Sequence, residues 1–344
     1  MKKVTVIGHF DWAENHMIGA VVKARNIFFQ LEKQYGRENV GDVDIYLWRQ
    51  HKKDVLGGIV QAFSSSKNII LVCSDTSMAL MQLFKMLKAL FKNKILYCVV
   101  GGNMAELLQD SPEQIKGLEI IDSFFVETQD CVESMQKIGI NNVKLCRNFK
   151  SIKPVLENEL KVDTTKPVKF CTFSRVVEEK GITDAIRAVT QINVEARKVE
   201  CCLDIYGSIE PEYRDKFEEL LRNNEYVTYR GVVDSEKSVQ VLKDYYCLLF
   251  PTKFQTEGIP GTIIDAFAAG VPVICSNWKR CAQIVTDGEN GIVYAFGDYD
   301  GLLKTIKEAI ERPKYIEKLK KGSLKSFDMY RADVAIKPLL NSMV

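Results

Sequence analysis

Short apolar runs alternate with longer amphipathic segments along almost the whole chain, and this alternation is the strongest constraint on its fold. Several of the short runs are apolar throughout, which is typical of parallel strands covered on both faces by helices. In the first half the expected strands are residues 4–8, 43–48, 68–73, 95–100, 123–127 and 143–146. Helical patterns lie between them, for example at residues 20–34, 78–91 and 129–138. This order predicts an α/β fold with right-handed, mostly parallel sheets.

The alternation pauses near residue 150 and then starts again. Residues 151–167 hold two prolines among polar residues, and we expect them to form a linker. Further strands are expected at residues 168–173, 203–206, 227–229, 248–251, 273–276 and 292–295, and further helices at residues 183–190, 213–222, 235–244, 261–269 and 302–311.

The chain is therefore predicted to form two Rossmann-like domains, residues 1–150 and 168–325. Their parallel sheets are expected to face one another across a cleft that binds ligands at the carboxyl ends of the strands. Residues 326–344 are amphipathic. We expect them to form a C-terminal helix, which either crosses back to the first domain or packs on its own domain.

Composition narrows the classes of function. The 344 residues carry 47 Lys and Arg against 45 Asp and Glu, so no global charge favours nucleic acid as a partner. No apolar stretch approaches the ~20 residues that cross a bilayer, and the first apolar stretch is too short for a signal peptide. The ten cysteines lie mostly within apolar runs. We expect reduced, buried thiols in a cytoplasmic protein.

Motifs of several common enzyme classes are missing from the sequence. Neither the G-x-G-x-x-G pattern of dinucleotide sites nor a P-loop occurs, which disfavours NAD-dependent oxidation and P-loop hydrolysis. The sequence has only three histidines, no H-E-x-x-H motif and no Cys-x-x-Cys pair, which argues against a zinc site. We therefore expect no metal and no other cofactor.

The segment 247–276 contains the clearest signal for a binding site. It reads as a buried strand, a loop, a helix that starts at Pro260 and Gly261, and a second buried strand. A proline is well tolerated at a helix start, and the amides that follow, including those of Gly261 and Thr262, have no partner within the helix. These amides and the helix dipole favour an anion, and Gly258 and Gly261 let it approach closely.

Two acids lie on either side of this helix start. Glu257 lies in the preceding loop, beside any bound anion, and Asp265 lies one turn into the helix. A carboxylate at the position of Asp265 can accept two hydrogen bonds from a vicinal diol such as a ribose. Alternatively, both acids are residues that the helix dipole favours near a helix start.

Two cations follow the first strand of the second half. Arg175 and Lys180 flank the turn that leads from that strand into the next helix. Arginine can bind a phosphate with two hydrogen bonds and lysine adds a point charge, so this pair fits a diphosphate. The alternative is that both pair with Glu178 and Glu179 in a solvated loop.

At these residues the chain resembles the group 1 (family 4) retaining glycosyltransferases, which have the two-domain GT-B fold. The resemblance rests on the two acids separated by seven residues, Glu257 and Asp265, and on G-x-P-V-I at residues 270–274. Supporting pieces are residues 174–175 and 180–181, 204–207, 230–232 and 285–291. The first half resembles capsule and exopolysaccharide members of the family less sharply.

The resemblance implies a role for each matching residue. Arg175 and Lys180 would bind the donor diphosphate, Glu257 the donor sugar, and Asp265 the ribose. The remaining donor contacts would come from Gly258, Gly261 and Thr262 at the helix start, from Gly207, Arg230, Gly231 and Val232 around the base, and from Gly19 facing the phosphates. The family usually has Glu where this chain has Asp265. Many members also carry a first-domain histidine that is not found here between His51 and the linker.

The implied function is transfer of a sugar, with retention of configuration, from a nucleotide-diphosphate sugar to a glycan or lipid-linked glycan in surface polysaccharide biosynthesis. UDP-sugars are the first expectation for the donor. Two alternatives remain open: a non-catalytic subunit that binds nucleotide sugars, and a sugar-nucleotide epimerase of the same fold. For the acceptor, the candidate contacts are Asp11, Trp12, Asn15, His16 and Asn103.

A basic amphipathic segment at residues 78–94 leaves two interpretations open. It contains Lys85, Lys88, Lys92 and Lys94 beside apolar residues, and no acid occurs from residue 76 to residue 105. Such a helix can lie on an anionic membrane, which would place the protein peripherally on the inner face of that membrane. Alternatively, it covers the sheet and carries lysines along its rim.

Overall fold

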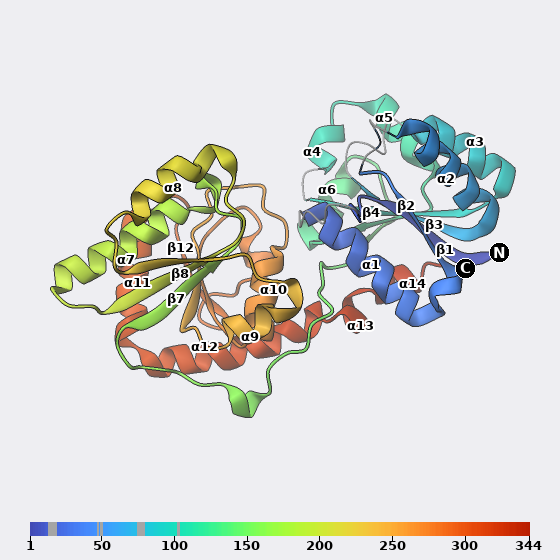
Figure 1. The fold of residues 1–344 in the computed structure, drawn as a ribbon. Coiled ribbons are helices and arrows are strands. Elements are labelled where there is room, and N and C mark those ends of the chain that lie inside the picture. The colour runs from blue at the N-terminus through green and yellow to red at the C-terminus, as the bar shows by residue number, and fades with distance from the viewer. Residues whose placement is uncertain (13–18, 47, 49–50, 74–79, 102–103) are drawn as a thin grey trace. The chain divides into compact units, whose positions relative to one another are not determined.

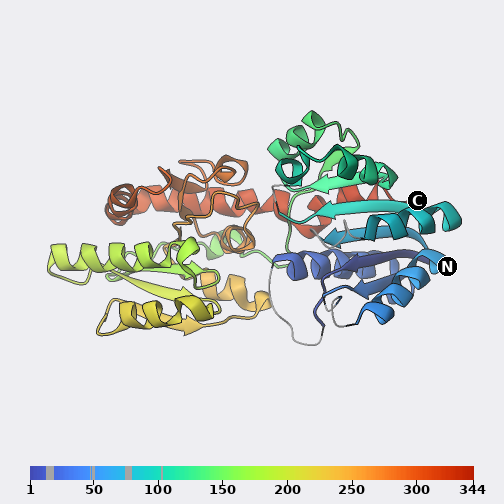
Figure 2. The ribbon, with the colours of Figure 1, turned by 90° about the horizontal axis from the view of Figure 1, so that it is seen from above.

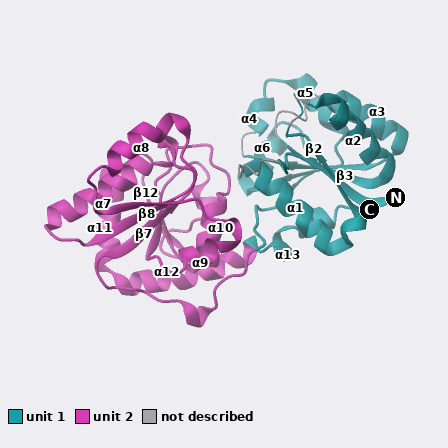
Figure 3. Cartoon of the chain, in the orientation of Figure 1, with its two compact units in different colours: residues 1–151, 330–344 teal, residues 152–329 magenta. Residues whose placement is uncertain are grey.

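The computed structural model describes residues 1–12, 19–46, 48, 51–73, 80–101 and 104–344. The chain forms two compact units, which Figure 3 shows in different colours: unit 1 is residues 1–151 with 330–344, and unit 2 is residues 152–329. Within the described residues each unit contains one six-stranded parallel sheet. The predicted α/β class with two parallel sheets is therefore confirmed.

Unit 1 is built on a sheet with the strand order β2-β1-β3-β4-β5-β6. Its strands are β1 (Lys2–Gly8), β2 (Val40–Asp44), β3 (Ser66–Cys73), β4 (Lys94–Val99), β5 (Ser123–Val126) and β6 (Val143–Leu145). Its helices are α1 (Gly19–Tyr35), α2 (Lys52–Ser65), α3 (Met81–Phe91), α4 (Met104–Leu108), α5 (Pro112–Gly117), α6 (Gln129–Lys137), α13 (Ala332–Ala335) and α14 (Lys337–Leu340). Figure 1 shows these elements by label.

The apolar runs of unit 1 are continuous because helices bury both faces of its sheet. On β3, Ile69 and Leu71 belong to one core cluster, whereas Ile70 and Val72 belong to the cluster on the opposite face. This is the alternation that a pleated strand imposes on successive side chains. The two clusters therefore account for a run without polar interruptions.

Unit 2 repeats this design with the strand order β12-β11-β10-β7-β8-β9. Its strands are β7 (Val168–Phe173), β8 (Cys201–Tyr206), β9 (Val227–Gly231), β10 (Cys247–Phe250), β11 (Val273–Ser276) and β12 (Gly291–Tyr294). Its helices are α7 (Ile182–Ala196), α8 (Arg214–Leu221), α9 (Ser238–Leu242), α10 (Gly261–Ala268), α11 (Tyr299–Glu311) and α12 (Pro313–Ser326). Figure 2 gives a second view of both sheets and their covering helices.

Some elements differ from those expected. The residues expected to form one C-terminal helix instead form the 3-10 helix η9 (Phe327–Tyr330) and the short helices α13 and α14. The expected linker belongs to unit 2 from residue 152 onward. There, Val155 is buried and its amide donates to the carbonyl of Ala268 at 2.9 Å. Val162 of the same segment packs against the core of unit 2, so the segment is attached to that unit.

The strand order of unit 2 decides which loops meet. β10 pairs with β7 in parallel, although β8 and β9 lie between them in the sequence. The loops that follow β7 and β10 therefore leave the same edge of the sheet side by side. In such sheets this edge is where ligands bind.

Candidate functional site

The loop after β10 is fastened to the turn after β7 by backbone contacts. The amide of Lys253 donates to the carbonyl of Glu179 at 2.8 Å. Gly181 has φ +71°, and a Cβ atom at this position would collide with the carbonyl of Pro251. Glycine is therefore required here by both the backbone angle and the close approach. The two loops are therefore packed directly against each other.

Lys180 and Glu257 form an ion pair on these two loops. Both side chains are largely buried, with exposed fractions of 15% and 11%. The Lys180 ammonium lies 5.5 Å from the ring centroid of Phe250, and Thr252 Oγ1 lies 3.4 Å from Glu257 Oε1. Two residues that the sequence analysis placed in separate motifs thus share one site.

Arg175 lies at the opposite end of the same turn and is paired differently. Its Nη1 donates to Glu210 Oε1 at 3.0 Å, and its side chain is about half exposed at 53%. The amide of Val176 donates to the carbonyl of Ser208 at 2.8 Å, which attaches this part of the turn to the loop after β8. Arg175 and Lys180 therefore flank the turn as predicted, but each has a different acid as its partner.

The alternative pairing of these cations with Glu178 and Glu179 is not the one that the structure contains. Glu178 instead accepts hydrogen bonds from Lys216 at 2.9 Å and from Lys253 at 3.3 Å, and from the hydroxyl of Thr183. Partial burial works to raise the pKa of Glu178, but these hydrogen bonds outweigh it and lower the pKa to about 2. Glu178 is therefore an ionised anchor for the turn.

The helix start expected at Pro260 and Gly261 is present. α10 begins at Gly261 with Pro260 as its N-cap residue, and the amide of Ile263 donates to the Pro260 carbonyl at 3.1 Å. The hydroxyl of Thr262 is buried, without a hydrogen-bond partner among the described residues. The positive end of the helix dipole thus lies directly after the loop that carries Glu257 and Gly258.

Asp265 is more enclosed than the sequence suggested. Its exposed fraction is 1%, and its Oδ1 lies 2.9 Å from the hydroxyl oxygen of Ser238 on α9. The Ser238 hydroxyl also lies 2.8 Å from the Ser235 carbonyl, but a carboxylate is the stronger acceptor for its single proton. Asp265 therefore holds α9 against α10, and its contact with a ribose stays a prediction.

The residues expected around the base lie at the ends of β8 and β9. The amide of Gly207 donates to the carbonyl of Gly231 at 2.9 Å, and the hydroxyl of Tyr229 donates to the Gly207 carbonyl at 2.8 Å. Val232 is 69% exposed. These contacts bring Gly207 and Gly231 together at the strand ends.

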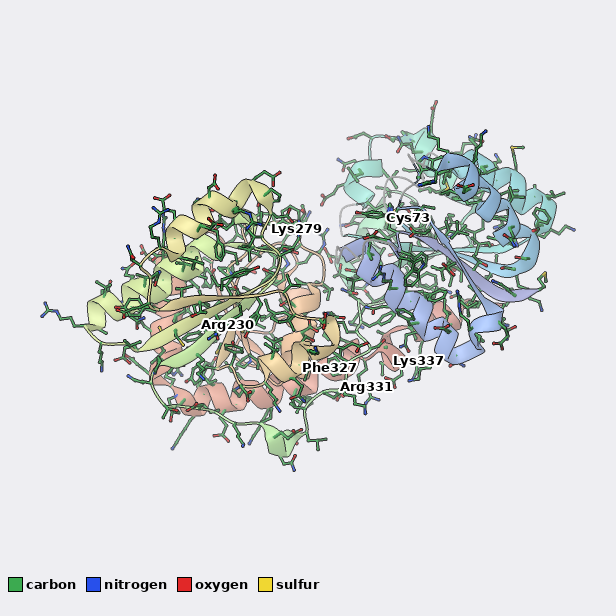
Figure 4. All side chains as sticks on the ribbon, viewed as in Figure 1. Cys73, Arg230, Lys279, Phe327, Arg331 and Lys337 are labelled. Carbon is green, nitrogen blue, oxygen red and sulfur yellow. The ribbon has the colours of Figure 1, made fainter. Side chains whose placement is uncertain are left out.

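Arg230 does not point toward these strand ends. Its Nε donates to Asp204 Oδ1 at 3.0 Å, and Asp204 lies within β8. Figure 4 labels Arg230 over the strands of unit 2. The Asp204 carboxylate also accepts a hydrogen bond from the Tyr245 hydroxyl at 2.6 Å. Arg230 is therefore tied to the face of the sheet.

The residues of unit 1 that were predicted to contact the acceptor or the donor differ in how the structure places them. Trp12 donates from Nε1 to Asp42 at 3.1 Å, stacks on Phe10 at 5.1 Å and lies under the guanidinium of Arg25 at 4.9 Å. The indole is thus engaged in packing, and its contact with an acceptor stays a prediction. The remaining unit 1 candidates are buried Asp11, exposed Gly19 at the start of α1, and Asn15, His16 and Asn103, which lie outside the described residues.

Three hydroxyl residues that organise this edge were not predicted from the sequence. Thr252 Oγ1 accepts a hydrogen bond from the amide of Phe254 at 3.2 Å, and Ser276 Oγ donates to the Thr252 carbonyl at 2.6 Å. Ser238 is the third, through Asp265. The only sequence signal for Thr252 and Ser276 was their position at the end of an expected strand, and no sequence signal marked Ser238.

Other expectations concern metals, thiols and membranes. Within the described ranges, no group of three or more His, Cys, Asp or Glu side chains is placed to hold a metal ion. The ten cysteines are thiols, and all except Cys202 are buried. Over the same part of the chain, no helix is both long and apolar enough to cross a bilayer.

Comparison with known sequences identifies a family for most of unit 2. Residues 156–326 match the family described as glycosyl transferases group 1. An uncharacterized glycosyltransferase of Methanocaldococcus jannaschii is 22% identical over 275 residues, covering 76% of this chain and 66% of that protein. The capsular polysaccharide biosynthesis glycosyltransferase CapM of Staphylococcus aureus is 28% identical over 139 residues, covering 40% and 35%. The matches thus span about two thirds or less of these curated relatives.

Solved structures agree on the fold. The crystal structure of Anabaena HepE in complex with UDP and glucose superposes with a TM-score of 0.72 at 13% identity and covers 99% of each chain. The apo form of the lipopolysaccharide outer core galactosyltransferase WaaB gives a TM-score of 0.66 at 18% identity and covers 99% of this chain and 98% of that one. This chain therefore has the GT-B type of two-sheet α/β fold, and its residues 156–326 match the family of glycosyl transferases group 1.

Proposed function

We propose that this chain is a glycosyltransferase that moves a sugar from a nucleotide-diphosphate sugar to a glycan or lipid-linked glycan during surface polysaccharide biosynthesis. A UDP-sugar is the proposed donor. Support comes from relatives named for capsular and lipopolysaccharide synthesis and from the similarity to HepE, which was crystallised with UDP and glucose.

The observation that carries this proposal is the Lys180–Glu257 pair beside the start of α10. When the bond between the anomeric carbon and the diphosphate breaks, its electron pair goes to the departing phosphate oxygen. Lys180, Arg175 and the amides of Gly261 and Thr262 would stabilise this developing negative charge. Glu257 would then exchange its contact with Lys180 for hydrogen bonds to hydroxyls of the donor sugar.

Retention of configuration follows if the acceptor attacks from the face that the diphosphate leaves. The acceptor oxygen forms the new bond to the anomeric carbon, and its proton passes to the departing phosphate oxygen. This route needs no first-domain histidine and no metal ion. The proposed contacts of Asp265 with the ribose and of Gly207, Gly231 and Val232 with the base would orient the donor, whereas Arg230 is held by Asp204 and is left out of the proposed base site.

Turnover of a panel of nucleotide sugars tests this proposal. Purified protein is incubated with each donor, with EDTA present, and release of nucleoside diphosphate is measured with and without oligosaccharide acceptors. We expect turnover with a UDP-sugar and a loss of roughly 10²–10³-fold in kcat for Lys180→Ala or Arg175→Ala. Lys307→Ala is the matched control, because Lys307 pairs with Glu195 on the helical surface of unit 2.

The two alternatives give different outcomes. Binding of UDP-sugars without release of UDP indicates the non-catalytic subunit. Conversion of the donor sugar into its epimer without transfer indicates the epimerase. Unchanged turnover in both variants would exclude the proposed diphosphate site.

A further inference from the structure

Two neighbouring helices of unit 1 present apolar side chains to solvent. On α2, Leu56 and Val60 are 37% and 43% exposed, and on α3, Met86 and Leu90 are 71% and 70% exposed. Each pair is spaced by four residues, so each forms a ridge along one side of its helix. We call these four residues, with the exposed lysines Lys52, Lys53, Lys85 and Lys92, the α2–α3 surface.

These ridges are not required by the core of unit 1. The same helices bury other residues against the sheet, namely Ile59 and Phe63 from α2 and Phe84 and Leu87 from α3. Phe63 and Phe84 stack with a centroid distance of 5.8 Å, which fixes the two helices side by side. The core cluster beneath these helices does not include Met86 or Leu90, and both side chains are exposed to solvent.

The charge of the α2–α3 surface is strongly positive. The segments 52–65 and 81–94 contain six lysines and one acid, Asp54. Lys88 is not counted in this surface, because its ammonium group pairs with Asp122 at 2.7 Å and donates to the carbonyl of Ile120. Lys85 and Lys92 are exposed on α3 beside its apolar ridge, and Lys92 caps the end of the helix.

We propose that the α2–α3 surface docks on an anionic lipid bilayer. Protruding apolar side chains enter the headgroup region, while lysine ammonium groups contact lipid phosphates. A folded protein partner would need a complementary shape, whereas a bilayer accepts separate ridges rimmed by lysines. This inference concerns unit 1 and is independent of the catalytic activity proposed above.

Sedimentation of the full chain with lipid vesicles tests the proposal. We expect cosedimentation with vesicles rich in phosphatidylglycerol, weaker binding at high salt, and little binding to phosphatidylcholine vesicles. Lys85→Ala with Lys92→Ala should weaken binding to anionic vesicles by roughly 30-fold, because each lysine near such a surface contributes about fivefold. Met86→Ser with Leu90→Ser should weaken it by roughly 100-fold.

Matched controls come from unit 2. Val194 is 62% exposed on α7 and Lys318 is exposed on α12, so Val194→Ser with Lys318→Ala removes one exposed apolar side chain and one exposed lysine elsewhere. This control should sediment like the unmodified protein. Thermal unfolding of every variant confirms that the fold is intact.

Three results would overturn the proposal. The first is no sedimentation with anionic vesicles, and the second is equal binding by the α2–α3 variants and the control. The third is self-association without lipid that Met86→Ser with Leu90→Ser abolishes, since a second copy of the chain would then cover this surface. Donor turnover is measured on the same samples, so that loss of catalysis and loss of docking are read separately.

Discussion

Lys180 and Glu257 lie 77 residues apart in the chain and form a largely buried ion pair at the carboxyl edge of the second sheet. One residue comes from the turn after β7 and the other from the loop after β10. Both are proposed to act on the donor, so the pair holds two functional groups in position before any ligand arrives.

This pair should also contribute to stability in a measurable way. Lys180→Met or Glu257→Gln leaves the other group largely buried without its main partner, so each should lower the free energy of unfolding by roughly 3 kcal/mol. The double variant should cost less than the sum of the two changes, with a coupling of about 1–3 kcal/mol. Urea unfolding of the four proteins measures this cycle, and strictly additive costs would contradict it.

The contact between Ser238 and Asp265 predicts a second stability effect. Ser238 is fully buried and its hydroxyl lies 2.9 Å from the Asp265 carboxylate. Ser238→Ala should lower the free energy of unfolding by about 2 kcal/mol, because a hydrogen bond to a buried charged group is lost. Ser64→Ala is the control, since that hydroxyl donates to the Gln61 carbonyl at an exposed position and should change stability by less than ~0.5 kcal/mol. Equal effects of the two changes would disprove the structural role of Ser238.

Gly181 is required where the two site loops meet. Gly181→Ala places a Cβ at φ +71° and against the Pro251 carbonyl, so it should destabilise the protein by about 2 kcal/mol or more. It should also reduce donor turnover, because the loops that carry Lys180 and Glu257 must separate. Gly117→Ala is the control: Gly117 has φ −61° and open space around it. That change should be neutral or stabilise by ~0.4–1 kcal/mol, and similar losses in both variants would count against this explanation.

Lys320 on α12 predicts a dependence of stability on pH. Burial lowers the pKa of this lysine to about 8, against opposing effects of Cys247, Cys171 and Asp244, and its Nζ donates to the Tyr245 carbonyl at 2.7 Å. Between pH 8 and the ordinary lysine value of 10.5 the folded state has released this proton while the unfolded state retains it. Stability due to Lys320 therefore rises with pH through this window, by roughly 3 kcal/mol in total.

Comparing the unmodified protein with Lys320→Met separates the contribution of Lys320 to this pH dependence from the contributions of buried cysteines and tyrosines. We expect the difference in unfolding free energy between the unmodified protein and the variant to increase in favour of the unmodified protein as the pH rises. Urea unfolding at a series of pH values measures it. A difference that stays constant from pH 7 to 10.5 would show that Lys320 keeps an ordinary pKa in the folded state.

The secondary structure of this chain was largely readable because its strands are marked by local apolar runs. Continuous runs such as the one in β3 predicted strands covered on both faces, and both core clusters of unit 1 confirm this. Helix α12 was missed, because lysines repeatedly interrupt its apolar residues. The C-terminal segment was expected as one helix because it is amphipathic, but it divides into a 3-10 helix and two short α-helices.

The sequence by itself determined two α/β units and the residue types of an anion site, because hydrophobic periodicity and motif spacing are properties of neighbouring residues. The tertiary structure decided which charges meet: Lys180 with Glu257, Arg175 with Glu210, and Asp265 with Ser238. The physical reason is the strand order, which places β10 beside β7 while β8 and β9 form the far edge. Strand order depends on long-range packing of the whole unit, and no local pattern in the chain records it.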